Sequence, residues 1–306
     1  MRKEDTSPSK GDNVTLVDRP TFQNADKKDD DGVVEDDWGL PCDFAVFCQH
    51  QAQTLYMGPN NNLSLQILCV EALTPLDMIQ LSNGDHDATG HCVWTACFLW
   101  LAALPHLLSQ LHAFRKNGRL RVLELGTGTG LGGLALLRHV PDAFVTLTDA
   151  DPAALDLCQR NVALNQIEME KVSICPLNWG TELPPNVPDH SYNVILAADI
   201  LYDIRMLPAI VSTATEAAVS HAIFYLAHVP RACYNHETRS DAPEVVDLES
   251  YIVDQVTKNG HWQLQSLSRP LDFSSTWQPP SDCLNKISLE DMQAVGAALF
   301  VFETRA

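Results

Sequence analysis

The stretch from Leu123 to Gly133 reads LELGTGTGLGG and has glycines at 126, 128, 130, 132 and 133. The run before it, LRVLEL (120–125), is apolar enough to predict a buried strand. The run after it, LGGLALLRHV (131–140), predicts a helix that ends before Pro141. A strand, a glycine-rich turn and a helix in this order indicate an α/β fold that receives a nucleotide-like cofactor at the turn.

The sequence on both sides of this stretch alternates strand and helix patterns. The predicted strands are 120–125, 143–149, 172–179, 192–199, 222–228, 261–267 and 295–304, and the predicted helices are 90–113, 131–140, 151–165 and 206–219. This order predicts an α/β fold with a doubly wound, Rossmann-like sheet of seven strands, mostly parallel. Ligands bind such sheets beyond the carboxyl ends of the strands. The positions expected there are 124–130, 149, 178–179 and 198–203.

The N-terminal part of the chain has a different character. Residues 1–40 are polar, contain the acidic run DKKDDDGVVEDDWG, and predict a disordered tail. Within residues 41–88, the apolar runs FAVFCQH and SLQILCVEAL are separated by GPNNN, which predicts a β-hairpin extension. Residues 89–306 would then form the cofactor-binding domain.

Composition limits the partners and the compartment. The net charge of −19 argues against nucleic acid or an anionic membrane as a partner and suits a basic protein. Nine cysteines without a CxxC pair, and a charged N-terminus, predict an intracellular protein of the cytoplasm or nucleus without a metal cluster. The uncharged run 92–111 is long enough to span a bilayer, but Pro105 and His106 favour a buried helix.

The glycine stretch can be interpreted in two registers. Gly128-x-Gly130-x-x-Gly133 matches the dinucleotide fingerprint, whereas Glu124-x-Gly126-x-Gly128-x-Gly130 resembles the cofactor loop of S-adenosylmethionine (SAM) methyltransferases. The second register places a glycine directly after the strand. It also places the carboxylate of Glu124 where it suits the cationic methionyl end of SAM better than a diphosphate. We therefore predict SAM as the cofactor.

Further motifs follow in a fixed order along the chain. They are G-x-x-V-W (Gly90 to Trp94), LELGTGTG, TDADP, N-x-x-x-N (Asn161 and Asn165), LNW and ADILYD. With these motifs, residues 88–232 resemble the seven-β-strand, family-16 methyltransferase-like protein-lysine methyltransferases. The glycine motif alone marks only a SAM enzyme, and the tryptophan before it and the Asp-x-x-Tyr after the fourth strand make the resemblance more specific.

The resemblance implies roles for particular residues at the cofactor site. Trp94 would line the site, Trp179 would flank the adenine, and Ala198 would touch the cofactor. Both tryptophans could instead be ordinary core residues. Asn178 stands where the family commonly has an aspartate.

Asp149, which ends the next strand, could bind ribose hydroxyls in either register of the glycine stretch. Gly126, Gly128 and Gly130 would let the backbone approach the cofactor closely. Gly132 and Gly133 are expected to let the following helix pack closely.

The acceptor side is predicted from ADILYD. Asp199 and Tyr202 are three residues apart on the turn that leaves the fourth strand, and they are the predicted catalytic pair. A lysine ammonium must lose a proton before it can attack, and the carboxylate of Asp199 could hold the incoming amine while the proton moves to water. Tyr202 would wall the channel. Asp199 could alternatively cap the strand end, and the adjacent Asp203 fits the family register less well.

The sequence thus predicts a SAM-dependent methyltransferase that modifies a protein side chain, most readily a lysine ε-amine, and that acts as a monomer. Histidine and arginine remain alternative acceptors because one scaffold serves several. The NPPY-type signature of base-amine methylation is absent after the fourth strand, where AADILY stands. A non-catalytic SAM-fold binding protein and an NAD-dependent oxidoreductase are the alternatives from other classes.

Overall fold

The computed structural model describes residues 50–70, 88–114, 118–230 and 247–305. These residues all belong to one compact unit, Phe44–Ala306. The acidic tail expected over residues 1–40 lies outside the described residues, as does most of the apolar run at 44–50.

A seven-stranded sheet forms the centre of this unit, with the strand order β5-β4-β3-β6-β7-β9-β8. Only β9 runs antiparallel to its neighbours, β7 and β8, whereas the other four pairings are parallel. The strand order reverses between β3 and β6, and such a reversal opens a crevice at the carboxyl ends of the strands. The strands are β3 (Arg121–Leu125), β4 (Phe144–Asp149), β5 (Val172–Pro176), β6 (Tyr192–Ala198), β7 (Ala218–His228), β8 (Trp262–Ser268) and β9 (Ala298–Thr304). The predicted fold and all seven predicted strands are confirmed.

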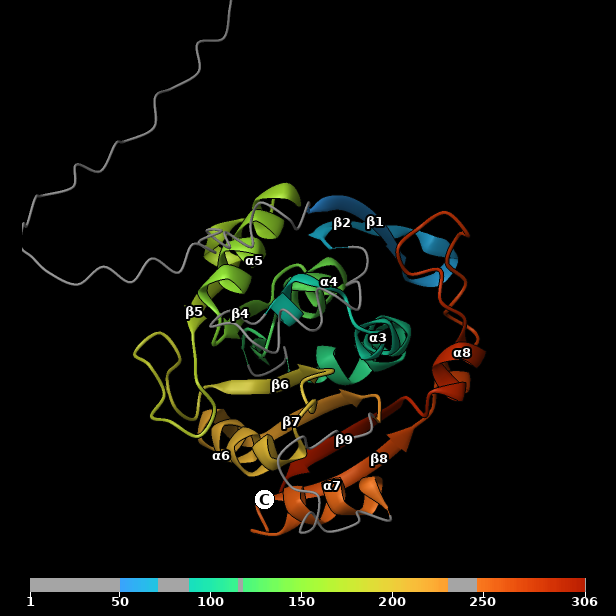
Figure 1. The fold of residues 1–306 in the computed structure, drawn as a ribbon. Helices are drawn as coiled ribbons and strands as arrows, with labels where there is room; N and C mark the ends of the chain where they lie inside the picture. The colour runs from blue at the N-terminus through green and yellow to red at the C-terminus, as the bar shows by residue number, and fades with distance from the viewer. Residues whose placement is uncertain (1–49, 71–87, 115–117, 231–246, 306) are drawn as a thin grey trace, which may run out of the picture. The chain divides into compact units, whose positions relative to one another are not determined.

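Helices cover both faces of the sheet (Figure 1). Val122 packs into a core cluster with α3, α4 and α5, whereas the next residue, Leu123, packs into a second cluster with α6 and α7. Successive side chains of a strand point to opposite faces, so strands buried on both faces are apolar throughout. The helices are α3 (Thr95–Phe114), α4 (Leu131–His139), α5 (Pro152–Leu164), α6 (Leu207–Ala217), α7 (Leu248–Thr257) and α8 (Leu289–Ala294).

The helix α3 is long and apolar enough to cross a membrane by length and composition. In this structure it packs against the sheet and α4. Trp100 is fully buried, donates through Nε1 to the carbonyl of Gly132 at 3.2 Å, and lies against the ring of Tyr225. The prediction of a helix is confirmed, and most of its first half is buried as expected, whereas residues 105–110 are half-buried or exposed. Its predicted start at residue 90 is wrong, because residues 88–91 form a separate 3-10 helix, η2 (Ala88–His91), and α3 begins at Thr95.

A two-stranded antiparallel hairpin precedes η2, as expected. It consists of β1 (Gln51–Met57) and β2 (Leu63–Cys69), joined through the 3-10 turn η1 (Pro59–Asn61). The run expected to form the first strand, FAVFCQH (44–50), lies almost entirely outside the described residues, and the strand that pairs with β2 is Gln51–Met57. The observed strand needs apolar side chains on one face only, and there Leu55 and Met57 are buried.

Asparagine side chains cover the outer edges of this hairpin. Asn161 of α5 and Asn165, which caps the end of that helix, each exchange two hydrogen bonds with the backbone of β2, at Leu68 and Gln66 respectively. On the other edge, Asn285 does the same with the backbone of Tyr56 in β1. A carboxamide offers one acceptor and two donors, so it can replace a strand residue in a ladder. An isolated two-stranded hairpin is marginal in water, and these bonds attach it to the rest of the unit.

We expect Asn285→Ala to lower the free energy of unfolding by about 1–3 kcal/mol, because Tyr56 would keep a backbone donor and acceptor without their partner. Asn285 is 0% exposed, so water does not reach the position readily. Urea denaturation followed by tryptophan fluorescence measures the change. The matched control is Asn62→Ala, at an exposed position of the same hairpin with an ordinary helical φ of −75°, which should cost less than about 0.5 kcal/mol. Equal losses in the two variants would contradict the assignment.

Candidate functional site

The glycine loop between β3 and α4 has a backbone that only glycine adopts easily. The φ angles of Gly126, Gly128 and Gly130 are +63°, +49° and +82°, all in the left-handed region. A Cβ atom on Gly128 would lie 3.0 Å from the carbonyl oxygen of Gly90 in η2. The loop is therefore held in a conformation that leaves no room for a side chain at Gly128, and η2 lies directly against it.

The carboxylate of Glu124 braces this loop from inside the protein. Glu124 is 3% exposed, and its Oε2 accepts hydrogen bonds from Thr127 Oγ1 at 2.7 Å and from the backbone N–H of Gly133 at 2.9 Å. Burial raises the pKa of Glu124 to about 7, although both donors act in the opposite direction. These contacts support a role for Glu124 in orienting the loop rather than in direct contact with the methionyl end of a cofactor.

Gly132 and Gly133 allow α4 to approach the sheet. A Cβ atom on Gly132 would collide with Glu124 Oε1, and one on Gly133 would lie 2.5 Å from Leu147 Cδ2 in β4. The expectation that these two glycines serve close packing is confirmed.

Asp149 lies at the carboxyl end of β4, beside the glycine loop. Its Oδ2 accepts from the backbone N–H of Gly128 at 2.9 Å, and its Oδ1 accepts from the N–H of Asp151 at 3.1 Å. Burial raises the pKa of this carboxyl, and the two hydrogen bonds lower it. The side chain is only partly buried, so its remaining acceptor positions can serve hydroxyl groups of a ligand.

The ends of β5 and β6 bring further predicted residues to the loop. A Cβ atom on Gly126 would lie 3.1 Å from Trp179 Cζ2 and 2.7 Å from Ile200 Cγ2. Trp179 therefore lies beside the glycine loop, as its predicted role at the adenine requires. Ala198, the last residue of β6, is 9% exposed and packs in the core cluster of α3 and α4.

Asp199 follows β6 directly and is held from two sides. Its backbone N–H donates to the carbonyl of Ala227, and its Oδ2 accepts from the N–H of Ala96 in the first turn of α3 at 3.2 Å. Its φ of +62° is unusual for a residue other than glycine, although aspartate and asparagine tolerate this region best. Asp199 is 6% exposed, so a structural role, satisfying a free donor at a helix start, is present beside any catalytic one.

Tyr202 does not share the environment of Asp199. Its side chain is 53% exposed, on the turn that leaves β6, whereas Asp199 is buried. Ile200, the residue after Asp199, lies against Gly126 of the glycine loop, whereas Tyr202 lies at the surface. The role of Tyr202 in a substrate channel stays a prediction.

Trp94 is placed by η2 rather than by the helix that was expected to carry it. It lies immediately before α3, and its indole Nε1 donates to the carbonyl of Thr89 at 2.8 Å. Thr89 precedes Gly90, the residue that lies against Gly128. Trp94 is partly buried, so it is joined to the segment that packs on the glycine loop without being a fully buried core residue like Trp100.

Sequence reasoning missed three contributors to this site. Thr127 was hidden inside the glycine motif although its hydroxyl bonds to Glu124. Ile200 lies within ADILYD, but nothing in its residue type indicates contact with a glycine. Gly90 was part of a quoted motif, and its close approach to Gly128 gives that glycine a physical reason.

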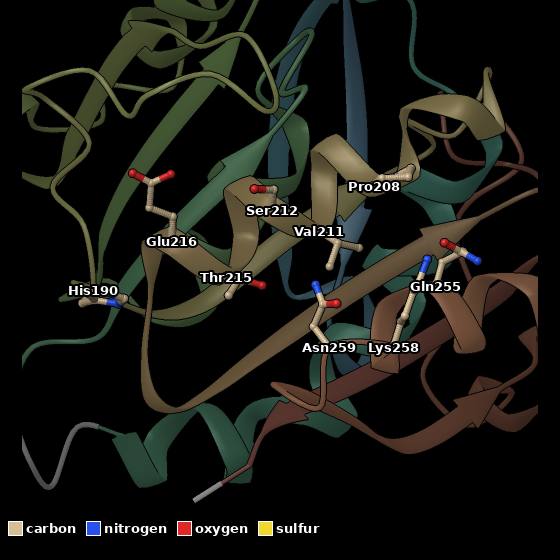
Figure 2. A pocket seen from close by; sticks show the side chains of 9 residues that line it. All are labelled: His190, Pro208, Val211, Ser212, Thr215, Glu216, Gln255, Lys258 and Asn259. Carbon is tan, nitrogen blue, oxygen red and sulfur yellow. The ribbon is translucent and has the colours of Figure 1, made fainter.

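A cavity of about 390 Å³ lies elsewhere, beside α6 and α7 (Figure 2). Its lining residues are His190, Pro208, Val211, Ser212, Thr215, Glu216, Gln255, Lys258 and Asn259. None of them comes from the carboxyl ends of β3, β4 or β5, and the two helices cover the opposite face from α3, α4 and α5. This cavity is therefore separate from the candidate site.

The residues at the switch point fit SAM better than a dinucleotide. The carboxylate of Asp149 accepts from the N–H of Gly128, a donor that a diphosphate would need, and its negative charge would repel a diphosphate. The same carboxylate suits a ligand with ribose hydroxyls and a cationic end. The partly buried ring of Trp179 beside Gly126 offers a flat surface for a base.

Comparisons with known proteins agree with these features. A family model described as lysine methyltransferase matches residues 74–240, more than half of the chain. EEF1A lysine methyltransferase 3 of Mus musculus is 34% identical over 152 residues, covering 49% of this chain and 62% of that protein. Protein N-lysine methyltransferase METTL21A of Danio rerio is 42% identical over 97 residues, covering 30% of this chain and 42% of that protein.

The matched region thus spans less than two thirds of these two relatives. A solved structure of a SAM-dependent methyltransferase from Aquifex aeolicus aligns with a TM-score of 0.42 and 11% identity, covering 70% of this chain and 100% of that one. The family match, together with the fold and the glycine loop, shows that this chain belongs to the lysine methyltransferase family.

Proposed function

We propose that the protein is a SAM-dependent methyltransferase that transfers a methyl group to a lysine ε-amine of another protein. The observation that carries this proposal is the loop of left-handed glycines held between the carboxylates of Glu124 and Asp149 at the switch point. Membership of the lysine methyltransferase family, and relatives named for lysine methylation, support the choice of acceptor.

The residues of the site would divide the work as follows. When bound, SAM supplies an electrophilic methyl group. Asp149 would accept hydrogen bonds from ribose hydroxyls, and Glu124, through Thr127 and Gly133, would keep the glycine loop in its binding conformation. Trp94 and Trp179 would exclude water from the cofactor on two sides.

Asp199 would act on the acceptor. One of its oxygens is anchored to the N–H of Ala96, which fixes the carboxylate in place before any ligand arrives. A fixed negative charge can hold the lysine ammonium in line with the methyl group, and the proton can then leave to water. Tyr202, exposed on the next turn, would contact the chain that carries the lysine.

The kind of partner, the oligomeric state and the location are proposed from the sequence alone. The net charge of −19 supports a basic protein substrate rather than nucleic acid or an anionic membrane. A monomeric state and a location in the cytoplasm or nucleus remain predictions. Histidine and arginine are the alternative acceptors on this scaffold.

Incubation of the purified protein with methyl-labelled SAM and a cell lysate tests the proposal. We expect label in one or a few proteins, and mass spectrometry should place the added methyl groups on lysine. A parallel reaction with excess S-adenosylhomocysteine gives the background. Label on histidine or arginine would correct the acceptor, and label only in RNA or in small molecules would refute protein methylation.

A further inference from the structure

Asn161 of α5 lies where the hairpin and the glycine loop meet. Its side chain is 0% exposed, and Oδ1 accepts from the backbone N–H of Leu68 in β2 at 2.7 Å. Its Nδ2 donates to the carbonyl of Leu68 at 3.1 Å and to the carbonyl of Thr129, inside the glycine loop, at 2.8 Å. A single carboxamide therefore joins β2 to the loop.

Asn165, one helical turn later, provides a natural comparison. Its Oδ1 accepts from the N–H of Gln66 at 3.0 Å, and its Nδ2 donates to the carbonyl of the same residue at 2.6 Å. Its Nδ2 also donates to the backbone of Asn161 within the same helix. The two asparagines thus make the same pair of bonds to the hairpin, but only Asn161 also holds the glycine loop.

The bond from Asn161 to Thr129 restrains the middle of the glycine loop. Thr129 stands between Gly128 and Gly130, both of which have positive φ, and glycines lose more backbone freedom on ordering than other residues. A loop that is already ordered binds its ligand more tightly than one that must be ordered on binding. Releasing the Thr129 carbonyl should therefore weaken cofactor binding without touching a residue that contacts the cofactor.

A second route connects the hairpin to the same loop. The N–H of Val70, just beyond β2, donates to the carbonyl of His91 in η2 at 2.9 Å. His91 follows Gly90, whose backbone lies against Gly128. The edge of β2 thus meets the loop both through α5 and through η2.

We propose that Asn161 is a positioning residue that couples the N-terminal hairpin to the cofactor loop, so that attachment of the hairpin sets the affinity for SAM. This inference rests on the proposed function, because it assumes that the loop binds SAM. The hairpin then contributes to the cofactor site through the carboxamide of Asn161 and, less directly, through the bond from Val70 to His91 in η2.

Calorimetric titration of SAM into the wild type, Asn161→Ala and Asn165→Ala tests the coupling without any acceptor substrate. We expect the Kd to rise about tenfold in Asn161→Ala, equivalent to about 1.4 kcal/mol, and to stay within about twofold in Asn165→Ala. Both variants should melt at similarly lowered temperatures, since each loses two bonds to β2. Hydrogen exchange of the ligand-free proteins should show faster exchange at residues 126–130 in Asn161→Ala only.

The changes of Kd decide whether Asn161 couples the hairpin to the loop or has a purely structural role. Equal changes of Kd in the two variants, or none in Asn161→Ala, would overturn the coupling and leave a purely structural role. If Asn161→Ala does not fold, the isosteric Asn161→Asp and Asn165→Asp replace the pair, because each keeps the acceptor for a β2 N–H and loses the donor to a β2 carbonyl, and only Asn161→Asp also loses the donor to Thr129. Failure of the wild type to bind SAM would refute the proposed function instead.

Discussion

The substitution Asp199→Asn should lower the rate of methyl transfer by about a hundredfold or more, while SAM binding is kept. The change removes the charge that would hold the lysine ammonium. It keeps the shape of the side chain and an oxygen that can accept from the N–H of Ala96. Asparagine also tolerates the φ of +62° at this position. The measurement is the single-turnover rate on the protein labelled in the lysate, with SAM in excess.

Two further variants separate charge from structure at this turn. Asp203, four residues after Asp199, bonds to Arg205 at the surface. Asp203→Asn removes a negative charge there and should change the rate of methyl transfer by less than about twofold. Asp199→Ala loses both the charge and the acceptor for Ala96, so it should also lower the free energy of unfolding by about 1–3 kcal/mol. A rate for Asp199→Asn close to that of the wild type would show that Asp199 only supports α3.

Glu124→Gln should change how stability depends on pH. The pKa of Glu124 is about 7 in the folded protein, against 4.5 for an ordinary glutamate, because burial disfavours the charged form. Between these two values the folded state holds a proton that the unfolded state has released. The favourable contribution is therefore fully present below about pH 4.5 and is lost as the pH rises through 7. The loss amounts to about 3 kcal/mol at alkaline pH.

Urea denaturation at pH 5 and pH 8 gives the fall in unfolding free energy between these two pH values. The contribution of Glu124 is the difference between this fall in the wild type and in Glu124→Gln. In Glu124→Gln, the fall in unfolding free energy between the two pH values should be smaller than in the wild type by about 2–3 kcal/mol. The exposed Glu182→Gln controls for the loss of one negative charge and should change the fall by less than about 0.5 kcal/mol. The same fall in Glu124→Gln and the wild type would show that Glu124 is ionised throughout this range.

The sheet was predictable because its strands are buried on both faces. Strands such as β6, with the sequence YNVILAA, are almost continuously apolar, and this pattern can be recognised from the sequence alone. The helix α7 left a weaker signal, since only Ile252 and Val256 are buried in it. The strand β1 was not predicted for a related reason, because a strand with one polar face carries few apolar residues.

The site was predictable as far as its residues follow strand ends. Glu124, Asp149 and Asp199 each stand at or next to the carboxyl end of a strand, and topology brings those ends together. What could not be predicted depends on distant contacts. The bond from Ala96 to Asp199 joins residues 103 positions apart, and no local pattern indicates it. The exposure of Tyr202 likewise depends on how the turn after β6 lies on the surface.

The bonds of Asn285 to Tyr56 affect the order in which a newly made chain can fold. The two residues are 229 positions apart, so the ribosome has made β1 long before its partner exists. At ~5–20 residues per second, the interval is roughly 10–50 s. Throughout it, the outer edge of β1 offers unpaired backbone groups, the kind of edge that recruits strands from other chains. A nascent chain that stops short of Asn285 should therefore need chaperone protection at its N-terminal hairpin more than the finished protein does.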